Sequence, residues 1–318
     1  MAATSTTSAP LEELGIGSVP STLPASPLTF PDGVRFRIEI PSVEGPACLD
    51  AVLDEADRRG VPVRRCSQGS GVFLLTDDEL DEMVGRARAA GVELSLFARP
   101  CAGWGTSATA RAPAGGGFAS VAHGTDQLRF ALDDIRRAAD HGVRSVLVSD
   151  LGLLSLFGRL RASGYLPPEM QAKVSAMLPI SNPATAKVLV ELGADTLNLQ
   201  TDLPLSDIAA IRAAVDVPLD VYVEAPDTLG GFIRLHELPE LVRVASPVYC
   251  KFGLRNAPDV YPSGLHLGST TVALSRERVR RAQLGMELLA RSGGDLTTSP
   301  PFAAGLAVPA ASTVPGRG

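Results

Sequence analysis

The stretch Pro218–Arg255 reads PLDVYVEAPDTLGGFIRLHELPELVRVASPVYCKFGLR and decides the fold. Its pattern predicts a strand, a loop, a helix and a second strand. In both strands apolar residues alternate with polar ones, as in Leu219-Asp220-Val221-Tyr222. A strand of a βα repeat is buried on both faces and is normally almost continuously apolar. Because unpaired buried charge is very costly, the charged residues of these strands must share a polar interior, which is typical of an active-site barrel.

The rest of the chain repeats this alternation of strand-like and helix-like runs. Several helix-like runs end on glycine just before the next strand, as in RRGVPV and AAGVEL, which is typical of a left-handed helix C-cap. The eight strand-like runs are 36–40, 61–66, 92–98, 145–149, 172–178, 195–200, 218–224 and 247–252. Eight strand–helix pairs predict an α/β fold, a single (β/α)8 TIM-type barrel, over residues 31–293.

The two ends of the chain differ from this pattern. Residues 1–30 and 294–318 are rich in Ser, Thr, Pro and Ala and lack apolar periodicity, so we expect flexible, disordered tails. A doubly wound sheet is the alternative fold, and it would need a G-x-G-x-x-G turn after an early strand. Gly69-Ser70-Gly71 and Gly115-Gly116-Gly117 match neither that spacing nor that context. The barrel is therefore preferred.

Composition narrows the class of function. The formal net charge of −6 does not favour a nucleic-acid partner, which usually requires a basic face. No apolar run approaches the roughly 20 residues that a membrane span needs, and the N-terminus lacks the pattern of a signal peptide. We therefore expect a cytoplasmic enzyme with a small-molecule substrate and no membrane partner. The oligomeric state stays open.

The cysteines are scattered, without the close spacing of metal-binding motifs. They are Cys48, Cys66, Cys101 and Cys250. Structural zinc and iron–sulfur sites usually have closely spaced cysteines. We expect four reduced thiols, mostly buried, and no iron–sulfur cluster.

Period-two alternation identifies the residues that face the barrel interior, which include Arg37, Lys173, Asp220 and Tyr249. Active sites of barrels lie at the carboxyl ends of the strands. Among inward residues near these ends we expect three to be catalytic: Glu39, Glu224 and Lys251. The expected substrate-binding residues are Arg99, Trp104, Asn198, Gln200, Tyr222, Gly230, Gly231 and Arg255.

These residue types are compatible with two mechanisms. In one, Glu39, Asp150 and Glu224 hold a hard divalent cation such as Mg²⁺ or Mn²⁺, while Lys251 and Arg99 bind an anionic substrate group. In the other, Lys251 forms a Schiff base with a carbonyl substrate and a carboxylate acts as acid or base, as in a lyase or aldolase. A third hypothesis is a barrel without catalytic activity that serves as a binding or scaffold protein.

Two loops carry further candidates. Residues 101–124 lack a secondary-structure pattern and contain Trp104, so this long connection is expected to be a substrate lid. The loop 225–232, APDTLGGF, follows the seventh strand, and its amides around Gly230 and Gly231 are expected to bind a phosphate or carboxylate.

The segment LGADTLNLQTDLPLSDIAAIRAAVDVPLDVYVEAPDTLGG (192–231), followed by VYCKFGLRN (248–256), resembles the collagenase-like peptidases of family U-thirty-two. The similarity lies mainly in residues 192–256. The family's strand end runs Glu-x-x-x-His-Gly-Ala-x-Cys, whereas Glu224 is followed here by APDTLGG, without the His and Cys of that signature.

The resemblance implies a (β/α)8-type barrel and a peptidase-like hydrolase. It also implies site positions at Glu224, Lys251 and Arg255, because Lys251–Arg255 is similar to the family's Lys-Ile-Glu-Gly-Arg segment. Some members of the family instead serve in hydroxylation of RNA or quinone precursors with an iron–sulfur cluster. The sequence therefore predicts a barrel enzyme that acts on a small anionic or carbonyl-containing substrate.

Overall fold

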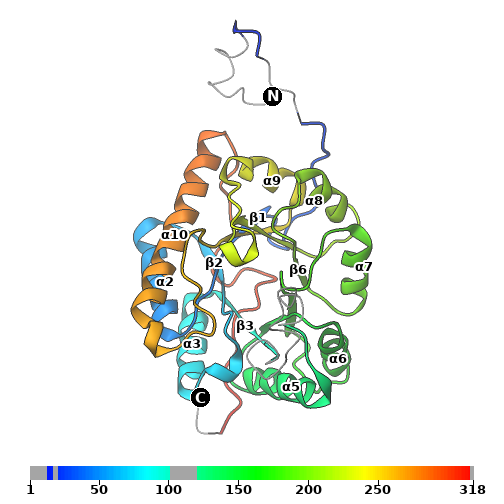
Figure 1. Cartoon of the computed structure of the whole chain (residues 1–318), viewed down its shortest axis with the longest axis vertical. Helices are drawn as coiled ribbons and strands as arrows, with labels where there is room; N and C mark the ends of the chain where they lie inside the picture. The colour runs from blue at the N-terminus through cyan, green and yellow to red at the C-terminus, as the bar shows by residue number, and fades with distance from the viewer. Residues whose placement is uncertain (1–12, 17–20, 101–119, 316–318) are drawn as a thin grey trace.

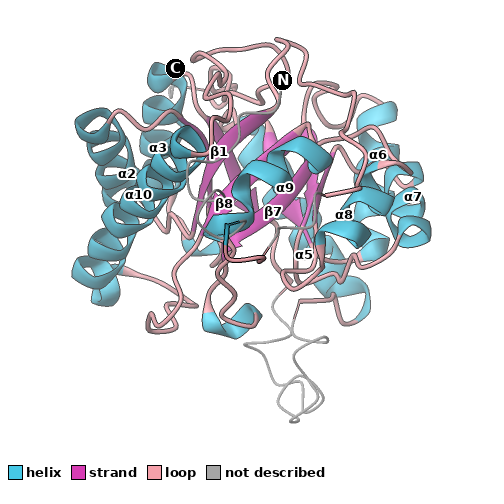
Figure 2. Cartoon of the chain, turned by 90° about the horizontal axis from the view of Figure 1, so that it is seen from above, coloured by secondary structure: helices cyan, strands magenta, loops and turns pink. Residues whose placement is uncertain are grey.

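The computed structural model describes residues 13–16, 21–100 and 120–315. Eight parallel strands close into a barrel in the order of the sequence, and helices surround them (Figures 1 and 2). The predicted TIM-type barrel is therefore confirmed. The strands are β1 (Phe36–Pro41), β2 (Val63–Ser67), β3 (Glu93–Phe97), β4 (Ser145–Val148), β5 (Gln171–Val174), β6 (Thr196–Asn198), β7 (Leu219–Glu224) and β8 (Val248–Phe252).

A helix lies between each pair of successive strands, as the alternation of strand-like and helix-like runs predicts. They are α2 (Pro46–Arg59), α3 (Asp77–Ala90), α5 (Gly124–Asp140), α6 (Leu151–Ala162), α7 (Pro183–Glu191), α8 (Leu205–Arg212), α9 (Leu238–Ala245) and α10 (Gly268–Arg291), with short 3₁₀ turns η1 (Val72–Leu74), η4 (Asp227–Leu229), η5 (Leu235–Glu237) and η6 (Leu265–Leu267). Helix α3 begins with a capping box between Thr76 and Glu79, and α2 and α3 end on left-handed Gly60 and Gly91.

The apolar core lies between the strands and the surrounding helices. In β7, for example, Leu219, Val221 and Val223 belong to this core. The alternate residues Asp220 and Tyr222 are also buried, but they face the barrel interior as part of a polar and aromatic set. The outward face of β7 is therefore apolar, whereas buried Arg65, Glu93 and Lys173 join Asp220 inside the barrel, so the predicted polar interior is confirmed.

The register of β7 against β8 shifts between Tyr222 and Glu224. Tyr222 is paired with Lys251, but Glu224 is paired with Phe252, so two steps along β7 match one step along β8. Such a bulge rotates the following side chain away from the simple alternation. Glu224 is therefore not on the inward face that period-two counting assigns to it.

The segments that flank the barrel differ from the predicted tails. Thr298 forms a parallel bridge with Phe36 of β1, and Phe302 donates its backbone N–H to Gly91 O at 3.1 Å. Farther along, Ala310 donates to Gly142 O at 2.8 Å. On the other side, Ser26 donates to Arg243 O at 2.9 Å. The expectation of a disordered tail is thus wrong for residues 21–30 and 294–315, because their backbones are hydrogen-bonded to the barrel.

None of the helices in the described ranges is long and apolar enough to cross a bilayer.

Candidate active site

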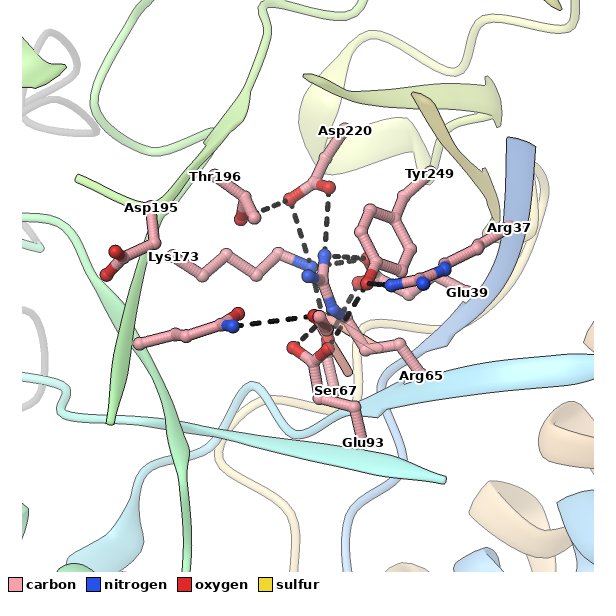
Figure 3. Close-up of polar contacts among 12 residues, drawn as sticks. Arg37, Glu39, Arg65, Ser67, Glu93, Lys173, Asp195, Thr196, Asp220 and Tyr249 are labelled. Carbon is pink, nitrogen blue, oxygen red and sulfur yellow. Dashed lines mark hydrogen bonds and ion pairs between the residues drawn. The ribbon is translucent and has the colours of Figure 1, made fainter. Parts of the chain in front are cut away.

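A network of ion pairs lies inside the barrel, among side chains from several strands (Figure 3). Arg65 of β2 lies at its centre with a fully buried side chain. Its Nε is 2.6 Å from Glu93 Oε1, and its Nη1 is 2.9 Å from Asp220 Oδ1 and 3.3 Å from Glu39 Oε2. The guanidinium also stacks on Tyr249, with its Cζ 3.4 Å from the ring centroid. Each buried charge is therefore met by an opposite charge, as burial requires.

Glu39 connects this network to two lysines from opposite sides of the barrel. Its Oε2 accepts a hydrogen bond from Lys173 Nζ of β5, and its Oε1 lies 3.3 Å from Lys251 Nζ of β8. Ser67 donates its hydroxyl to Glu39 Oε1 at 2.7 Å. Lys173 also lies 3.3 Å from Asp220 Oδ2. A single carboxylate thus holds two amines, one on each oxygen.

The burial of this cluster shifts its protonation equilibria. Burial acts to raise the pKa of Glu39, but Lys173, Lys251 and Arg65 outweigh it and hold the pKa well below its ordinary value. The Glu39 side chain is therefore a carboxylate at any physiological pH. Burial lowers the pKa of Lys173 to about 8, with further lowering from Lys251 and Arg65, against the attraction of Asp220 and Glu39. Lys173 can therefore exchange a proton near neutral pH.

A cavity of about 240 Å³ lies above the network, at the carboxyl ends of the strands. It combines apolar walls with a few polar side chains, as binding sites for small molecules do. Its floor includes Lys251 and Ser67, which both contact Glu39 below. The other lining residues are Pro41, Ser42, Gln68, Gly69, Phe97, Arg99, Leu147, Ser175, Ala176, Met177, Asn198, Tyr222, Pro226, Thr228, Leu229, Asp259 and Tyr261.

Four of the predicted site residues line this cavity: Lys251, Arg99, Asn198 and Tyr222. The Lys251 ammonium lies over the Tyr222 ring, 4.3 Å from its centroid, a cation–π geometry. Asn198 is 2% exposed, and its Oδ1 has no hydrogen-bond partner among the described residues. A buried amide that faces a cavity without a partner is poised to bind a ligand.

Glu224 is not in the cavity, because of the β7 bulge. Its Oε1 accepts a hydrogen bond from Arg255 N at 2.9 Å, and its Oε2 lies 3.5 Å from Arg281 Nε of α10. The structure therefore does not bring Glu224 together with Glu39. Gln200 also does not line the cavity; its backbone N–H donates to Ile180 O at 3.2 Å.

The other predicted ligands have structural partners. Asp150 caps α6 by accepting from Leu153 N at 2.8 Å. Gly230 and Gly231 donate their N–H groups to Asp227 O and Pro226 O within the turn, both at 3.0 Å, so these amides are already used. The expected anion site there is wrong for that reason. Arg255 is largely exposed, 3.7 Å from an Asp227 oxygen.

The predicted metal site is not assembled. Across residues 13–16, 21–100 and 120–315, no three His, Cys, Asp or Glu side chains gather as metal ligands would. Glu39, Asp150 and Glu224 are held by separate partners, as described above, so the expectation of a shared divalent cation is wrong for these residues. Trp104 and most of the predicted lid lie outside the described residues. Cys48, Cys66 and Cys250 are buried thiols.

Sequence reasoning passed over three residues at the site: Ser67, Lys173 and Tyr261. Lys173 was in the inward set, but its place low on β5 gave no signal that it would reach Glu39. Tyr261 belongs to the loop after β8 and pairs its hydroxyl with Ser42. It closes over the cavity against Gly69, where an added Cβ would come within 2.5 Å of the Tyr261 ring. A loop contact of this kind has no periodic signal.

Comparison with known proteins gives one match to a family. Residues 119–225, about a third of the chain, match peptidase family U32. The match contains the strands from β4 to β7 and includes Glu224, whereas Lys251 and Arg255 lie beyond it. No curated protein matches the chain.

Several solved structures are similar at low identity. A U32 peptidase, Mk0906, has a TM-score of 0.40 and 19% identity, over 60% of this chain and 70% of that one. A truncated 3-deoxy-D-arabino-heptulosonate 7-phosphate synthase from Thermotoga maritima has a TM-score of 0.46 and 14% identity, over 83% and 90% of the two chains. Oxaloacetate acetylhydrolase has a TM-score of 0.46 and 12% identity, over 84% and 86%. Similarities of this size do not bear on activity.

The chain is thus a (β/α)8 barrel protein with a polar interior and a cavity at the carboxyl ends of its strands. Over residues 119–225 it is similar to peptidase family U32.

Proposed function

We propose that this chain is an enzyme of the lyase or aldolase type, in which Lys251 forms a Schiff base with a small carbonyl compound. The observation that carries the proposal is the pair of lysines on Glu39, one of which lines the cavity. Lys251 lines the cavity, and its Nζ lies 3.3 Å from Glu39 Oε1. Lys173 contacts the other oxygen, Oε2, and does not line the cavity.

The first step needs a neutral amine at Lys251. A neighbouring cation favours the neutral form of a nucleophilic lysine, and Lys173 becomes that cation once it has taken the proton. When Lys173 is neutral, the Lys251 ammonium gives a proton to Glu39 Oε1, the carboxyl group rotates, and Lys173 takes that same proton. The sum is one proton moved from Lys251 to Lys173, with Glu39 a carboxylate before and after.

The second step forms the bond to substrate. The Lys251 nitrogen adds to the carbonyl carbon, the carbinolamine loses water, and a protonated imine remains. This cation withdraws electrons from the neighbouring carbon, so a carbon–carbon bond there can break or form. The Tyr222 ring below Lys251 favours the cationic imine as it favours the ammonium. Asn198, with its unpartnered Oδ1, supplies a polar contact for a donor group of the substrate.

Peptidase-like hydrolysis is the second candidate, and the match to family U32 is the observation that favours it. The carboxylate pair that would serve it, Glu39 and Glu224, is divided between the barrel interior and the α10 side. A barrel that only binds its ligand is the third candidate. Both would bind without a covalent bond to Lys251.

Borohydride reduction tests the proposal, because it converts an imine on lysine into a stable amine. We expect the full chain, incubated with 2-oxopropanoate or its amide and then reduced, to gain the mass of one reduced adduct on the peptide containing Lys251. Lys251→Met should gain none, and Lys187→Met, a change on helix α7, should react like the wild type. Saturable binding of these compounds without an adduct would exclude the Schiff base and leave a binding protein or a hydrolase.

A further inference from the structure

Arg278 of α10 is a buried cation without an ionic partner. Its side chain is 5% exposed. One hydrogen bond holds it, from Nη1 to Ser42 O at 3.2 Å, whereas Nε has no partner in the described part of the chain. No carboxylate oxygen of the described residues lies within 4.0 Å of its guanidinium nitrogens. This sets Arg278 apart from Arg65, which has three carboxylates around it.

The acidic residues near Arg278 are Glu44, Asp227 and Asp259, and each is engaged elsewhere. Asp227 accepts a hydrogen bond from Asn256 N. Glu44 accepts from Gly69 N at 2.8 Å and Ser70 N at 3.0 Å, one bond on each oxygen. Asp259 is exposed and accepts from Tyr261 N at 3.0 Å. A buried guanidinium cannot shed its proton as a lysine can, so its charge must be met by another group. Burial lowers the pKa of Arg278, which reflects the same missing counter-charge.

Arg278 lines a small side cavity that adjoins the main one. The side cavity has a volume of about 40 Å³, and it shares Ser42, Pro226, Thr228, Asp259 and Tyr261 with the lining of the main cavity. One water occupies roughly 10–15 Å³ on this measure, so the space corresponds to about three small heavy atoms. That is the size of a carboxylate group, whereas a phosphate has five heavy atoms.

We propose that Arg278 binds a carboxylate of the substrate in this side cavity. Together with the proposed function, on which this inference rests for the carbonyl end, it assigns the substrate to the oxo acids. The carbonyl carbon reaches Lys251 and the carboxylate reaches Arg278. Lys251 lines the main cavity, with its ammonium 4.3 Å from the Tyr222 ring centroid, and Arg278 lines the side cavity that shares five residues with it. A planar guanidinium can donate two parallel hydrogen bonds to a carboxylate, which the compact ammonium of a lysine cannot do.

Calorimetric titration tests the carboxylate site without any chemistry at Lys251. The probes are acetate, 2-hydroxypropanoate and butanedioate, which have no reactive carbonyl. Arg278→Met should weaken the tightest of them by about tenfold or more, because a hydrogen bond to a charged group is lost. Arg280→Met is the matched control, since Arg280 is on the same helix and pairs with Glu277 at the surface. It should bind like the wild type.

Borohydride trapping with 2-oxopropanoate and its uncharged amide supplies the second arm. Arg278→Met should raise the half-saturating concentration of the acid by about tenfold and leave that of the amide unchanged. Unchanged amide trapping also shows that the variant is folded, and Arg278→Gln repeats the test with a polar side chain. Absence of trapping in every protein would refute the Schiff base alone. Equal carboxylate affinity in Arg278→Met and wild type, or no carboxylate binding to wild type, would overturn the Arg278 site.

Discussion

Lys251 Nζ lies 3.3 Å from Glu39 Oε1, and the two residues are also register partners on the adjacent strands β8 and β1. Their contact therefore follows from strand pairing and does not depend on a loop. Lys251 contacts Glu39 Oε1, and Lys173 of β5 contacts the other oxygen, Oε2, from across the barrel. The barrel geometry thus sets one amine in the cavity floor and the other beneath it.

The rate of imine formation should rise with pH through about pH 8. Lys173 must be neutral to take the proton from Lys251, and burial lowers its pKa to about 8. Below that pH Lys173 is an ammonium and accepts nothing. Trapping rates measured from about pH 6 to 10 should follow one ionisation near 8. Lys173→Met should lose this dependence and fall by about a hundredfold, the low end for general acid–base catalysis. A variant that kept the same profile would assign the ionisation to another group.

The same shift should appear in stability. The folded-state pKa of Lys173 lies below its ordinary value of 10.5, so between about pH 8 and 10.5 the unfolded chain binds more protons than the folded one at this site. The contribution of Lys173 to the free energy of unfolding therefore rises with pH in that window. Urea denaturation of wild type and Lys173→Met across the window should give a difference that changes in that direction. A difference independent of pH would contradict the shift.

Arg65→Met should strongly destabilise the barrel. The substitution leaves Glu93 and Asp220 with reduced compensation in a fully buried site, and breaking such a network costs about 3–5 kcal/mol. The free energy of unfolding from urea titration measures this loss. Arg58→Met is the control, because Arg58 is 61% exposed and pairs only with Glu55 one turn away, so its change should stay within about 0.5 kcal/mol. A comparable loss in both variants would show that burial of the network is not the cause.

Ser299→Ala should destabilise the protein although Ser299 lies far beyond the last strand. Its hydroxyl accepts from Arg37 Nε at 2.7 Å, and Arg37 also donates to Ala304 O at 2.8 Å. Leaving the buried Nε without an acceptor costs about 1–3 kcal/mol. Thermal and urea unfolding of the variant measure this, with Ser163→Ala in an exposed helix end as the reference. Unchanged stability would mean that the segment around Ser299 is not held in solution.

Asp150→Ala should behave as the loss of a helix cap and not as the loss of a metal ligand. The carboxylate accepts from Leu153 N and from Ala122 N at 3.0 Å, so its removal should cost about 1 kcal/mol. Addition of Mg²⁺ or Mn²⁺, or of a chelator, should shift the melting temperature of variant and wild type equally. A metal-induced stabilisation that only the wild type shows would restore Asp150 as a ligand.

Much of the barrel could be predicted because its signals are periodic and local. The strand around Glu39 was predicted at 36–40 and lies at 36–41, and Gly91, the glycine of AAGVEL, is the left-handed residue that ends α3. The inward position of Lys251 and Asn198 followed from the same alternation. These features depend only on neighbouring residues, which the sequence displays directly.

The remaining features depend on contacts between distant residues. A one-residue bulge moves Glu224 out of the interior, and nothing in VYVEAPD signals it. Asp150 is one step out of the inward phase, and its role as a cap depends on where α6 begins. The composition after residue 294, rich in Ser, Thr, Pro and Ala, is typical of a disordered tail. Arg37 nevertheless donates hydrogen bonds to Ser299 and Ala304 of this segment. Composition alone cannot show such a partner.

Arg37 and Ser299 are 262 positions apart. On a ribosome, which makes the chain from its N-terminus, the Arg37 guanidinium emerges early and its acceptor emerges only after all eight strands have been synthesised. Until then the Arg37 Nε lacks this acceptor. Formation of this contact is therefore a late event in biogenesis, and a ribosome stalled before residue 299 would carry a chain in which it cannot form.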